Sequence, residues 1–228
     1  MDKIIKIKGA IFDMDGTLID SLIFWEYYWR ELGKTFKGDP NFLPTEEDDR
    51  AVRTMITLDA SKFIKERYNF SQSVEELYAF VNDLIKHFYR DIVKEKLGAT
   101  ELLEYLKEKN IKICLATATD MENVKIAIKA CNLEKYFCSV LSCADIGKGK
   151  DKPDIYIKAM QELNLSSDEV CIFEDSFVAI ETAKNLGVKT VGIFDKNNYG
   201  QDRLKNSSDY YLEEGKSLSE LIKVVDKL

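Results

Sequence analysis

The sequence is poor in the residues that build zinc and disulfide sites. Its 228 residues include a single histidine, His87, and five cysteines without any Cys-x-x-Cys pair. Most of these cysteines lie in apolar surroundings and their number is odd, so we interpret them as reduced core residues of a cytoplasmic protein. Because His87 lies in a helical pattern rather than beside a pair of cysteines, we expect no structural zinc site.

Long apolar runs and basic stripes are also missing. No apolar run approaches the ~18 residues of a membrane span. The first residues, Met1-Asp2-Lys3, do not form a positive segment followed by an apolar one, so we expect no secretory signal. The net charge of −7 argues against nucleic acid as a partner. The only dense basic cluster covers residues 148–152. We favour a phosphate-facing role for it, and a solvated loop is the alternative.

What is present is the composition of an ordinary soluble globular protein, with 45% apolar and 32% charged residues. The length suits one large domain, or a core that carries a smaller insert. We expect a monomer, with a dimer as the alternative.

The middle of the chain differs from both ends. Residues 20–95 show helical spacing in three stretches, 22–32, 45–68 and 74–92, and no convincing strand. Ser73 to Glu76 fits a capping box at the start of the third stretch. From Leu97 onward, helical and strand patterns alternate. We therefore predict a core made of residues 1–19 and 96–228, with an all-helical domain inserted at residues 20–95.

The predicted elements of the core define its fold class. The predicted strands are residues 9–12, 111–116, 139–141, 170–173, 188–193 and 210–212. The predicted helices are 100–109, 121–131, 153–163, 177–186 and a closing helix that starts with a second capping box at Ser217 to Glu220, while 195–208 is expected to be a polar loop. Strands that alternate with helices of this length predict an α/β fold with a doubly wound, Rossmann-like parallel sheet. Ligands of such sheets bind beyond the carboxyl ends of the strands.

The first strand ends in two carboxylates, Asp13 and Asp15, which strand spacing places on one face. Gly16 lets the chain turn without a Cβ clash, and Thr17 supplies a hydroxyl. At about 4 Å and an effective dielectric near 20, repulsion between two such charges costs roughly 4 kcal/mol. A bound cation or a nearby Lys or Arg usually compensates it. An acidic turn without function is the alternative.

The run Asp-x-Asp-Gly-Thr-Leu after an apolar strand resembles the first signature of the haloacid dehalogenase-like hydrolases, which use an aspartate nucleophile. The resemblance spans Gly9 to Ile193 and is strongest to the β-phosphoglucomutase-like phosphatases with a helical cap. It implies that Asp13 attacks phosphorus and becomes an aspartyl-phosphate, and that Asp15 is the general acid/base. Gly16 and Thr17 would contribute to phosphate binding. Dehalogenating members lack the second carboxylate, so the resemblance favours phosphoryl chemistry.

Two further motifs resemble the phosphate-binding parts of this family. Thr117 matches the second motif, and the N–H groups of Ala118 and Thr119 would hold phosphate oxygens at the start of the next helix. Lys150 matches the third motif, ahead of Pro153-Asp154-Ile155-Tyr156. It would neutralise the nucleophile and the phosphoryl group. The family commonly has Pro where this chain has Asp151, which leaves Lys152 as an alternative.

Glu174 and Asp175, which close the strand at 170–173, resemble the metal-binding pair of the fourth motif. Adjacent acids at a strand end are also common as surface residues. The resemblance makes Asp175 a direct ligand and Glu174 a direct or water-mediated one. It adds the carboxylate of Asp13 and the backbone carbonyl of Asp15. Hard oxygen ligands together with a substrate phosphate indicate Mg²⁺.

The insert occupies the position of the family's cap, which closes over the site and supplies leaving-group contacts. Arg53 and Thr54 lie where relatives place a substrate loop, but they fit a helix surface equally well. The aromatic run from Phe24 to Trp29 is more typical of packing than of sugar stacking. We therefore expect a Mg²⁺-dependent phosphatase for a small phosphorylated metabolite. A β-phosphoglucomutase that uses the same phospho-aspartate, or a non-catalytic binding or regulatory domain, is the alternative.

Overall fold

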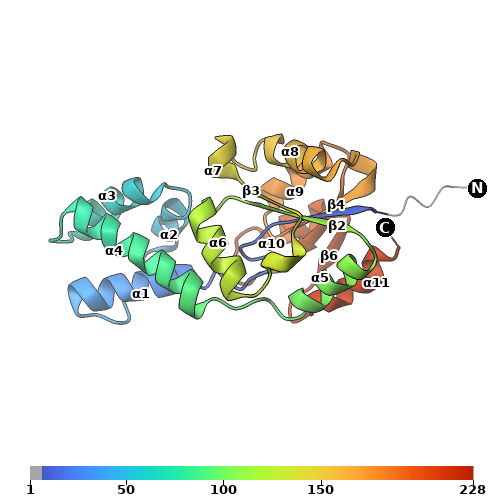
Figure 1. The fold of residues 1–228 in the computed structure, drawn as a ribbon. Coiled ribbons are helices and arrows are strands. Elements are labelled where there is room, and N and C mark those ends of the chain that lie inside the picture. The colour runs from blue at the N-terminus through green and yellow to red at the C-terminus, as the bar shows by residue number, and fades with distance from the viewer. Residues whose placement is uncertain (1–6, 228) are drawn as a thin grey trace, which may run out of the picture. The chain divides into compact units, whose positions relative to one another are not determined.

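The computed structural model describes residues 7–227 (Figure 1). The chain divides into two compact units. The first contains residues up to Leu22 and from Val93 onward, and the second is Ile23–Ile92. The sequence-based division, at residues 20 and 95, lies close to these points. Within the described residues, no helix is both long enough and apolar enough to cross a bilayer.

A six-stranded parallel sheet forms the centre of the first unit, in the order β3-β2-β1-β4-β5-β6. The predicted doubly wound α/β sheet is therefore confirmed. All four residues of the first strand are buried, because it lies between two neighbouring strands with helices on both faces of the sheet. The strands are β1 Gly9–Phe12, β2 Lys112–Thr117, β3 Ser139–Ser142, β4 Val170–Glu174, β5 Lys189–Ile193 and β6 Tyr210–Leu212.

Alternate residues of the central strands pack on opposite faces of the sheet. On one face, Ile11 and Ile172 join a buried cluster with Ile155 and Tyr156 of α8 (Asp154–Leu163) and residues of α9 (Phe177–Lys184). Phe173, the next residue along β4, stacks on the neighbouring ring of Phe12 with 4.2 Å between centroids. Close packing on both faces fixes β1 and β4 side by side. Their carboxyl ends therefore have little freedom to move apart.

The predicted helices of the first unit are present in the predicted order, but the structure adds two short helices that were not predicted, at Cys143–Ile146 and Gln201–Ser207. The predicted polar loop 195–208 contains a two-turn helix, Gln201–Ser207, which begins after Gly200 in a left-handed conformation. The second predicted box, at Ser217 to Glu220, is present, but it opens a short 3₁₀ turn before the last helix. The elements are α5 Ala99–Glu108, α6 Met121–Ala130, α7 Cys143–Ile146, α8 Asp154–Leu163, α9 Phe177–Lys184, α10 Gln201–Ser207 and α11 Ile222–Val225, with 3₁₀ turns η2 Glu134–Tyr136, η3 Ser167–Glu169 and η4 Leu218–Leu221.

The second unit is entirely helical, with α1 Phe24–Lys37, α2 Glu46–Val52, α3 Thr57–Tyr68, α4 Val74–His87 and the π-helical turn η1 Phe88–Ile92. The predicted helical stretch 45–68 is broken in two, because Ile56 is extended. The capping box at Ser73 and Glu76 is confirmed. The aromatic run packs as predicted, with Tyr28 and Trp29 buried in this unit's own core.

The five cysteines are free thiols. Cys114, Cys143 and Cys171 are buried, in line with the prediction of core residues, whereas Cys138 is exposed. Burial raises the pKa of the Cys114 thiol to about 12, so this residue behaves as a small apolar side chain.

Candidate active site

The loop that follows β1 is folded tightly against the end of β4. Gly16 has a φ of +77°, and a Cβ at this position would lie 2.2 Å from Oδ2 of Asp175. Both the conformation and the lack of space therefore require glycine. The N–H of Gly16 donates to the carbonyl of Ile19, and that of Thr17 donates to the carbonyl of Met14. Both N–H groups thus form hydrogen bonds within their own loop, and the contribution of Gly16 and Thr17 to phosphate binding stays a prediction.

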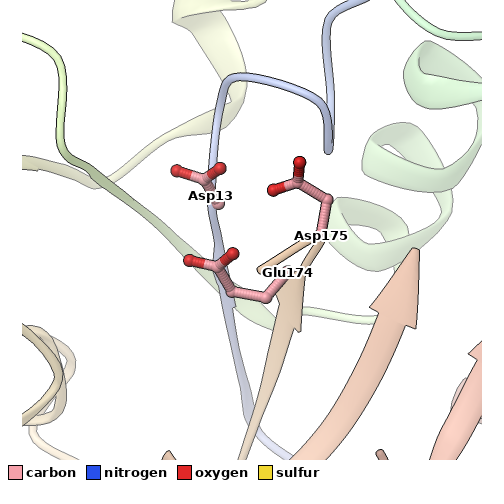
Figure 2. A group of neighbouring side chains, drawn as sticks. All are labelled: Asp13, Glu174 and Asp175. Carbon is pink, nitrogen blue, oxygen red and sulfur yellow. The ribbon is translucent and has the colours of Figure 1, made fainter. Parts of the chain in front are cut away.

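Three carboxylates meet where β1 and β4 end (Figure 2). Asp13, Glu174 and Asp175 are all buried, and one oxygen from each lies within 4.8 Å of the others. They converge because β1 and β4 are paired in parallel, with Phe12 opposite Phe173. The structure thus brings together the three side chains that were predicted to bind a metal. The backbone carbonyl of Asp15 as a further ligand stays a prediction.

Lys150 reaches the same acids from the loop before α8. Its Nζ lies 2.5 Å from Oδ1 of Asp13 and also donates to Oε1 of Glu174. Lys152, the alternative, pairs instead with Asp151 at 3.5 Å, and both side chains are exposed. The hydroxyl of Tyr156 donates to Glu174 at 3.2 Å, a contact that we did not predict from the sequence. The structure therefore brings Lys150, and not Lys152, to the acids.

Asp15 is held by the residues that follow β2. The hydroxyl of Thr119 donates to Oδ2 of Asp15 at 2.7 Å, and that of Thr117 lies 3.5 Å from the same oxygen. The N–H of Thr119 donates to the hydroxyl of Thr117, while Ala118 is exposed. From the sequence, Thr119 was expected to act through its N–H alone. Its side chain contacts the predicted acid/base, and the sequence carried no sign of this contact.

A family model for haloacid dehalogenase-like hydrolases matches residues 10–193, most of the chain. The chain belongs to this family. The match runs from β1 through the end of β5, so it includes all four strand-end motifs and the inserted helices. The site residues described above all lie within the matched range of this haloacid dehalogenase-like hydrolase.

The relatives of this hydrolase are mostly named phosphatases. A phosphorylated carbohydrates phosphatase of Thermotoga maritima is 29% identical over 92% of each chain. The pyrophosphatase PpaX of Bacillus mycoides is 26% identical over 82% of this chain and 84% of its own. Among solved structures, a Thermotoga maritima protein provisionally assigned as a β-phosphoglucomutase has a TM-score of 0.82 and 27% identity, covering 97% of this chain and 100% of its own.

Burial and mutual repulsion raise the pKa of two carboxylates of this hydrolase, Asp13 and Asp175. Burial, opposed by Lys150 and reinforced by Glu174 and Asp15, raises the pKa of Asp13 to about 7. Burial, Asp13 and Glu174 together raise the pKa of Asp175 well above its usual range. Burial opposes the charged form of Lys150, but the two acids that it contacts raise its pKa well above the usual value. One lysine thus faces three carboxylates, and this oxygen-rich donor set fits a hard divalent cation.

The raised pKa of Asp13 predicts how the metal-free protein responds to pH. An unfolded aspartate has a pKa near 3.9, so the folded state binds more protons between about pH 4 and pH 7. Stability should therefore fall as pH rises through this window, and the full penalty should persist above it. Each pKa unit corresponds to about 1.4 kcal/mol, so the penalty is on the order of a few kcal/mol.

The variant Asp13→Asn isolates this effect, because an amide at this position carries no charge. In EDTA at pH 8, we expect its melting temperature to exceed that of the wild type by several degrees, at roughly 2–4 °C per kcal/mol. Near pH 5 the difference should shrink. Thermal unfolding at both pH values measures it, and equal melting temperatures at pH 8 would contradict the electrostatic account.

One contact of the three clustered acids was not predicted from the sequence. The side-chain Nδ2 of Asn198, in the loop after β5, donates to Oδ2 of Asp175 at 2.7 Å and to its backbone carbonyl at 3.1 Å. The hydroxyl of Thr17 lies 3.5 Å from the other carboxylate oxygen, Oδ1. No motif in the sequence singles out Asn198, which lies in the segment predicted to be a polar loop.

In the second unit, Arg53 and Thr54 make contacts within that unit. Arg53 pairs with Asp49 at 2.7 Å, and its guanidinium lies 5.4 Å from the ring centre of Trp25. The hydroxyl of Thr54 donates to the carbonyl of Ala51 at 2.8 Å. Arg53 follows the last residue of α2 directly and is largely buried by these contacts. A role for Arg53 in substrate binding stays a prediction.

Proposed function

We propose that this protein is a Mg²⁺-dependent phosphatase that hydrolyses a small phosphorylated metabolite through an aspartyl-phosphate on Asp13. The observation that carries the proposal is the contact of the buried Asp13 carboxylate with Lys150, beside Glu174 and Asp175. An aspartate needs no base to become a nucleophile, provided that a cation offsets the cost of its burial. Relatives named as phosphatases for carbohydrates and for pyrophosphate support the reaction class.

In the first step, a carboxylate oxygen of Asp13 forms a bond to phosphorus while the bond from phosphorus to the leaving oxygen breaks. Lys150 offsets the negative charge of the nucleophile and of the phosphoryl oxygens. Asp15 gives its proton to the leaving alcohol. The hydroxyl of Thr119 holds the Oδ2 atom of Asp15, which fixes the orientation of this acid.

In the second step, water attacks the phosphoryl group and the bond between phosphorus and Asp13 breaks. Asp15, now a carboxylate, takes the proton from this water, and inorganic phosphate leaves. We propose that Asp13, Glu174 and Asp175 hold Mg²⁺, which when bound neutralises charge on the phosphoryl oxygens. The N–H of Ala118, an exposed residue, and the hydroxyl of Thr117 are the proposed phosphate contacts at the end of β2.

We propose further that the helical second unit serves as a cap that selects the leaving group. The enzyme would act in the cytoplasm on a free small molecule, without a nucleic acid or membrane partner. The net charge of −7 supports this proposal, because a polyanionic partner would be repelled.

Mg²⁺ dependence is the direct test of this proposal. Protein treated with EDTA and then desalted should lose phosphate release from p-nitrophenyl phosphate by about a hundredfold or more, because the charge stabilisation by a metal is worth several kcal/mol. Addition of Mg²⁺ should restore the rate, and a panel of sugar, nucleotide and glycolytic phosphates would then identify the substrate. Full activity of the metal-free protein would remove Mg²⁺ from the mechanism.

A β-phosphoglucomutase is the second candidate, favoured by the 0.82 TM-score to the Thermotoga maritima protein with that provisional assignment. The mutase would use the same phospho-aspartate but return the phosphoryl group to the sugar. Conversion of β-glucose 1-phosphate to glucose 6-phosphate, stimulated by a trace of glucose 1,6-bisphosphate, would identify the mutase. Release of inorganic phosphate without such conversion would identify the phosphatase.

A further inference from the structure

We propose that Asn198 is a positioning residue that holds the carboxylate of Asp175 in the orientation that binds the divalent cation. This inference rests on the proposed function only for the identity of the cation site. Within the described residues, the side-chain amide of Asn198 donates hydrogen bonds to Asp175 and none to Asp13, so we assign it an effect through Asp175 alone.

The contact of Asn198 with Asp175 is short and specific. Its Nδ2 donates to Oδ2 at 2.7 Å and to the carbonyl oxygen of the same residue at 3.1 Å. Two bonds from one amide group fix both the backbone and the side chain of Asp175. Because an amide is neutral, it can hold the carboxylate without competing with a cation for its charge, as residues behind metal ligands commonly do.

Asn198 is itself fixed by the loop that carries it. Its Oδ1 accepts from the N–H of Tyr199 at 2.8 Å, and its own N–H donates to the carbonyl of Asp195 at 3.0 Å. The carboxylate of Asp195 accepts from the N–H of Asn197 at 2.8 Å and pairs with Lys96 at 2.7 Å. Asp195 is 3% exposed, so this ion pair is a buried anchor.

Gly16 and Thr17 lie beside the carboxylate of Asp175 but hold it less firmly than Asn198 does. Gly16 approaches so closely that a Cβ there would lie 2.2 Å from Oδ2, the oxygen that Asn198 holds. Thr17 lies on the side of the other oxygen, Oδ1, at 3.5 Å. Without the amide, repulsion from Asp13 and Glu174 would favour rotation of the carboxylate away from the cluster. Preorganisation by Asn198 therefore raises affinity for the cation.

The test compares cation binding by full-length variants. Asn198→Leu keeps nearly the same size but removes the donor, Asn198→Ser is too short to reach Asp175, and Asn198→Gln keeps the amide on a longer side chain. Asn206→Leu is the matched control, because Asn206 is an exposed amide in α10. Electron paramagnetic resonance measures the binding of Mn²⁺, and calorimetry measures the binding of Mg²⁺. Neither measurement needs a substrate, so both report cation affinity independently of catalytic activity.

We expect Asn198→Leu and Asn198→Ser to weaken cation binding by about 10- to 100-fold, the range found when a residue behind a metal ligand is lost. Asn198→Gln should recover part of the affinity, and Asn206→Leu should match the wild type. The rise in melting temperature on adding Mg²⁺ should shrink in the first two variants, since it follows the dissociation constant. A residue that only stabilises its loop would lower the melting temperature in EDTA and leave this rise unchanged.

The inference would be overturned if Asn198→Leu or Asn198→Ser folds and binds the cation as tightly as the wild type. It would also be overturned if the wild-type protein binds neither Mn²⁺ nor Mg²⁺. If Asn198→Leu does not fold, Asn198→Ser decides. The proposed function fails in a different way: a wild type that binds the cation but hydrolyses no phosphate ester refutes the phosphatase, while the comparison of variants still decides the role of Asn198.

Discussion

Replacement of Asp13 by Asn is expected to lower phosphate release from p-nitrophenyl phosphate by at least about four orders of magnitude, as losses of catalytic nucleophiles do. Asn keeps the shape of the side chain and can still accept from Lys150, but it offers no anionic oxygen to phosphorus. The loss should appear in kcat for good and poor leaving groups alike, because every turnover begins with this attack. Steady-state rates at saturating Mg²⁺ measure it.

Controls separate loss of the nucleophile from damage to the fold. Asp202→Asn makes the same exchange at an exposed position in α10 and should retain the wild-type rate. Asp13→Ala excludes the slow deamidation that converts asparagine back to aspartate. Residual activity that grows on storage in Asp13→Asn but not in Asp13→Ala would come from that reaction. An unchanged rate in both Asp13 variants would refute the assignment of the nucleophile.

The acidic end of β1 could be predicted because its signal is local. Gly9–Phe12 is a short apolar run, and the residues after it combine two acids with a glycine. Polar side chains at the ends of parallel strands meet at one edge of the sheet. The resemblance to the haloacid dehalogenase-like hydrolases then indicated that Asp13 lies with Glu174 and Asp175. The close approach of Gly16 to Asp175, in contrast, could not be predicted from the sequence. It depends on tertiary packing, which the sequence does not display.

The role of Asn198 could not be predicted for the same reason. The side chain bonds to a residue 23 positions earlier, across the ends of two adjacent strands. The residues around it are polar and carry Gly200, which favours a loop, although α10 begins directly after that glycine. Side chains that hold other side chains leave no periodic pattern, unlike core positions in helices and strands.

The break between α2 and α3 shows another limit of periodicity. Helical spacing continues through residues 45–68, so one helix was expected. In the structure this helix is interrupted between α2 and α3. There the hydroxyl of Thr54 donates to the carbonyl of Ala51, so a side chain takes the place of a backbone N–H as the partner of this carbonyl. Thr45 and Ser73, in contrast, are residue types that favour the N-cap position, so the helix starts at these residues can be recognised in the sequence. Both side chains accept hydrogen bonds from backbone N–H groups there.

The exchange of Asp15 for Asn should separate the two chemical steps. Proton transfer by a positioned acid or base contributes about 10²–10⁴-fold to a rate. With an alkyl phosphate such as glucose 6-phosphate, both steps need Asp15, so we expect a loss of that size in kcat/KM. With p-nitrophenyl phosphate, the leaving phenolate needs no proton. The first step should then remain fast while hydrolysis of the aspartyl-phosphate is slow.

This difference predicts a burst of p-nitrophenolate followed by accumulation of phosphorylated protein, seen as the mass of one added phosphoryl group. The contact with Thr119 gives a milder form of the same test. Thr119→Val keeps the shape but removes the hydroxyl that orients Asp15, so its loss should be smaller and should again be greater for the alkyl phosphate. Equal losses for both substrates in Asp15→Asn, with no phosphorylated protein, would show that Asp15 transfers no proton. The site would then act through Asp13, Lys150 and the cation alone.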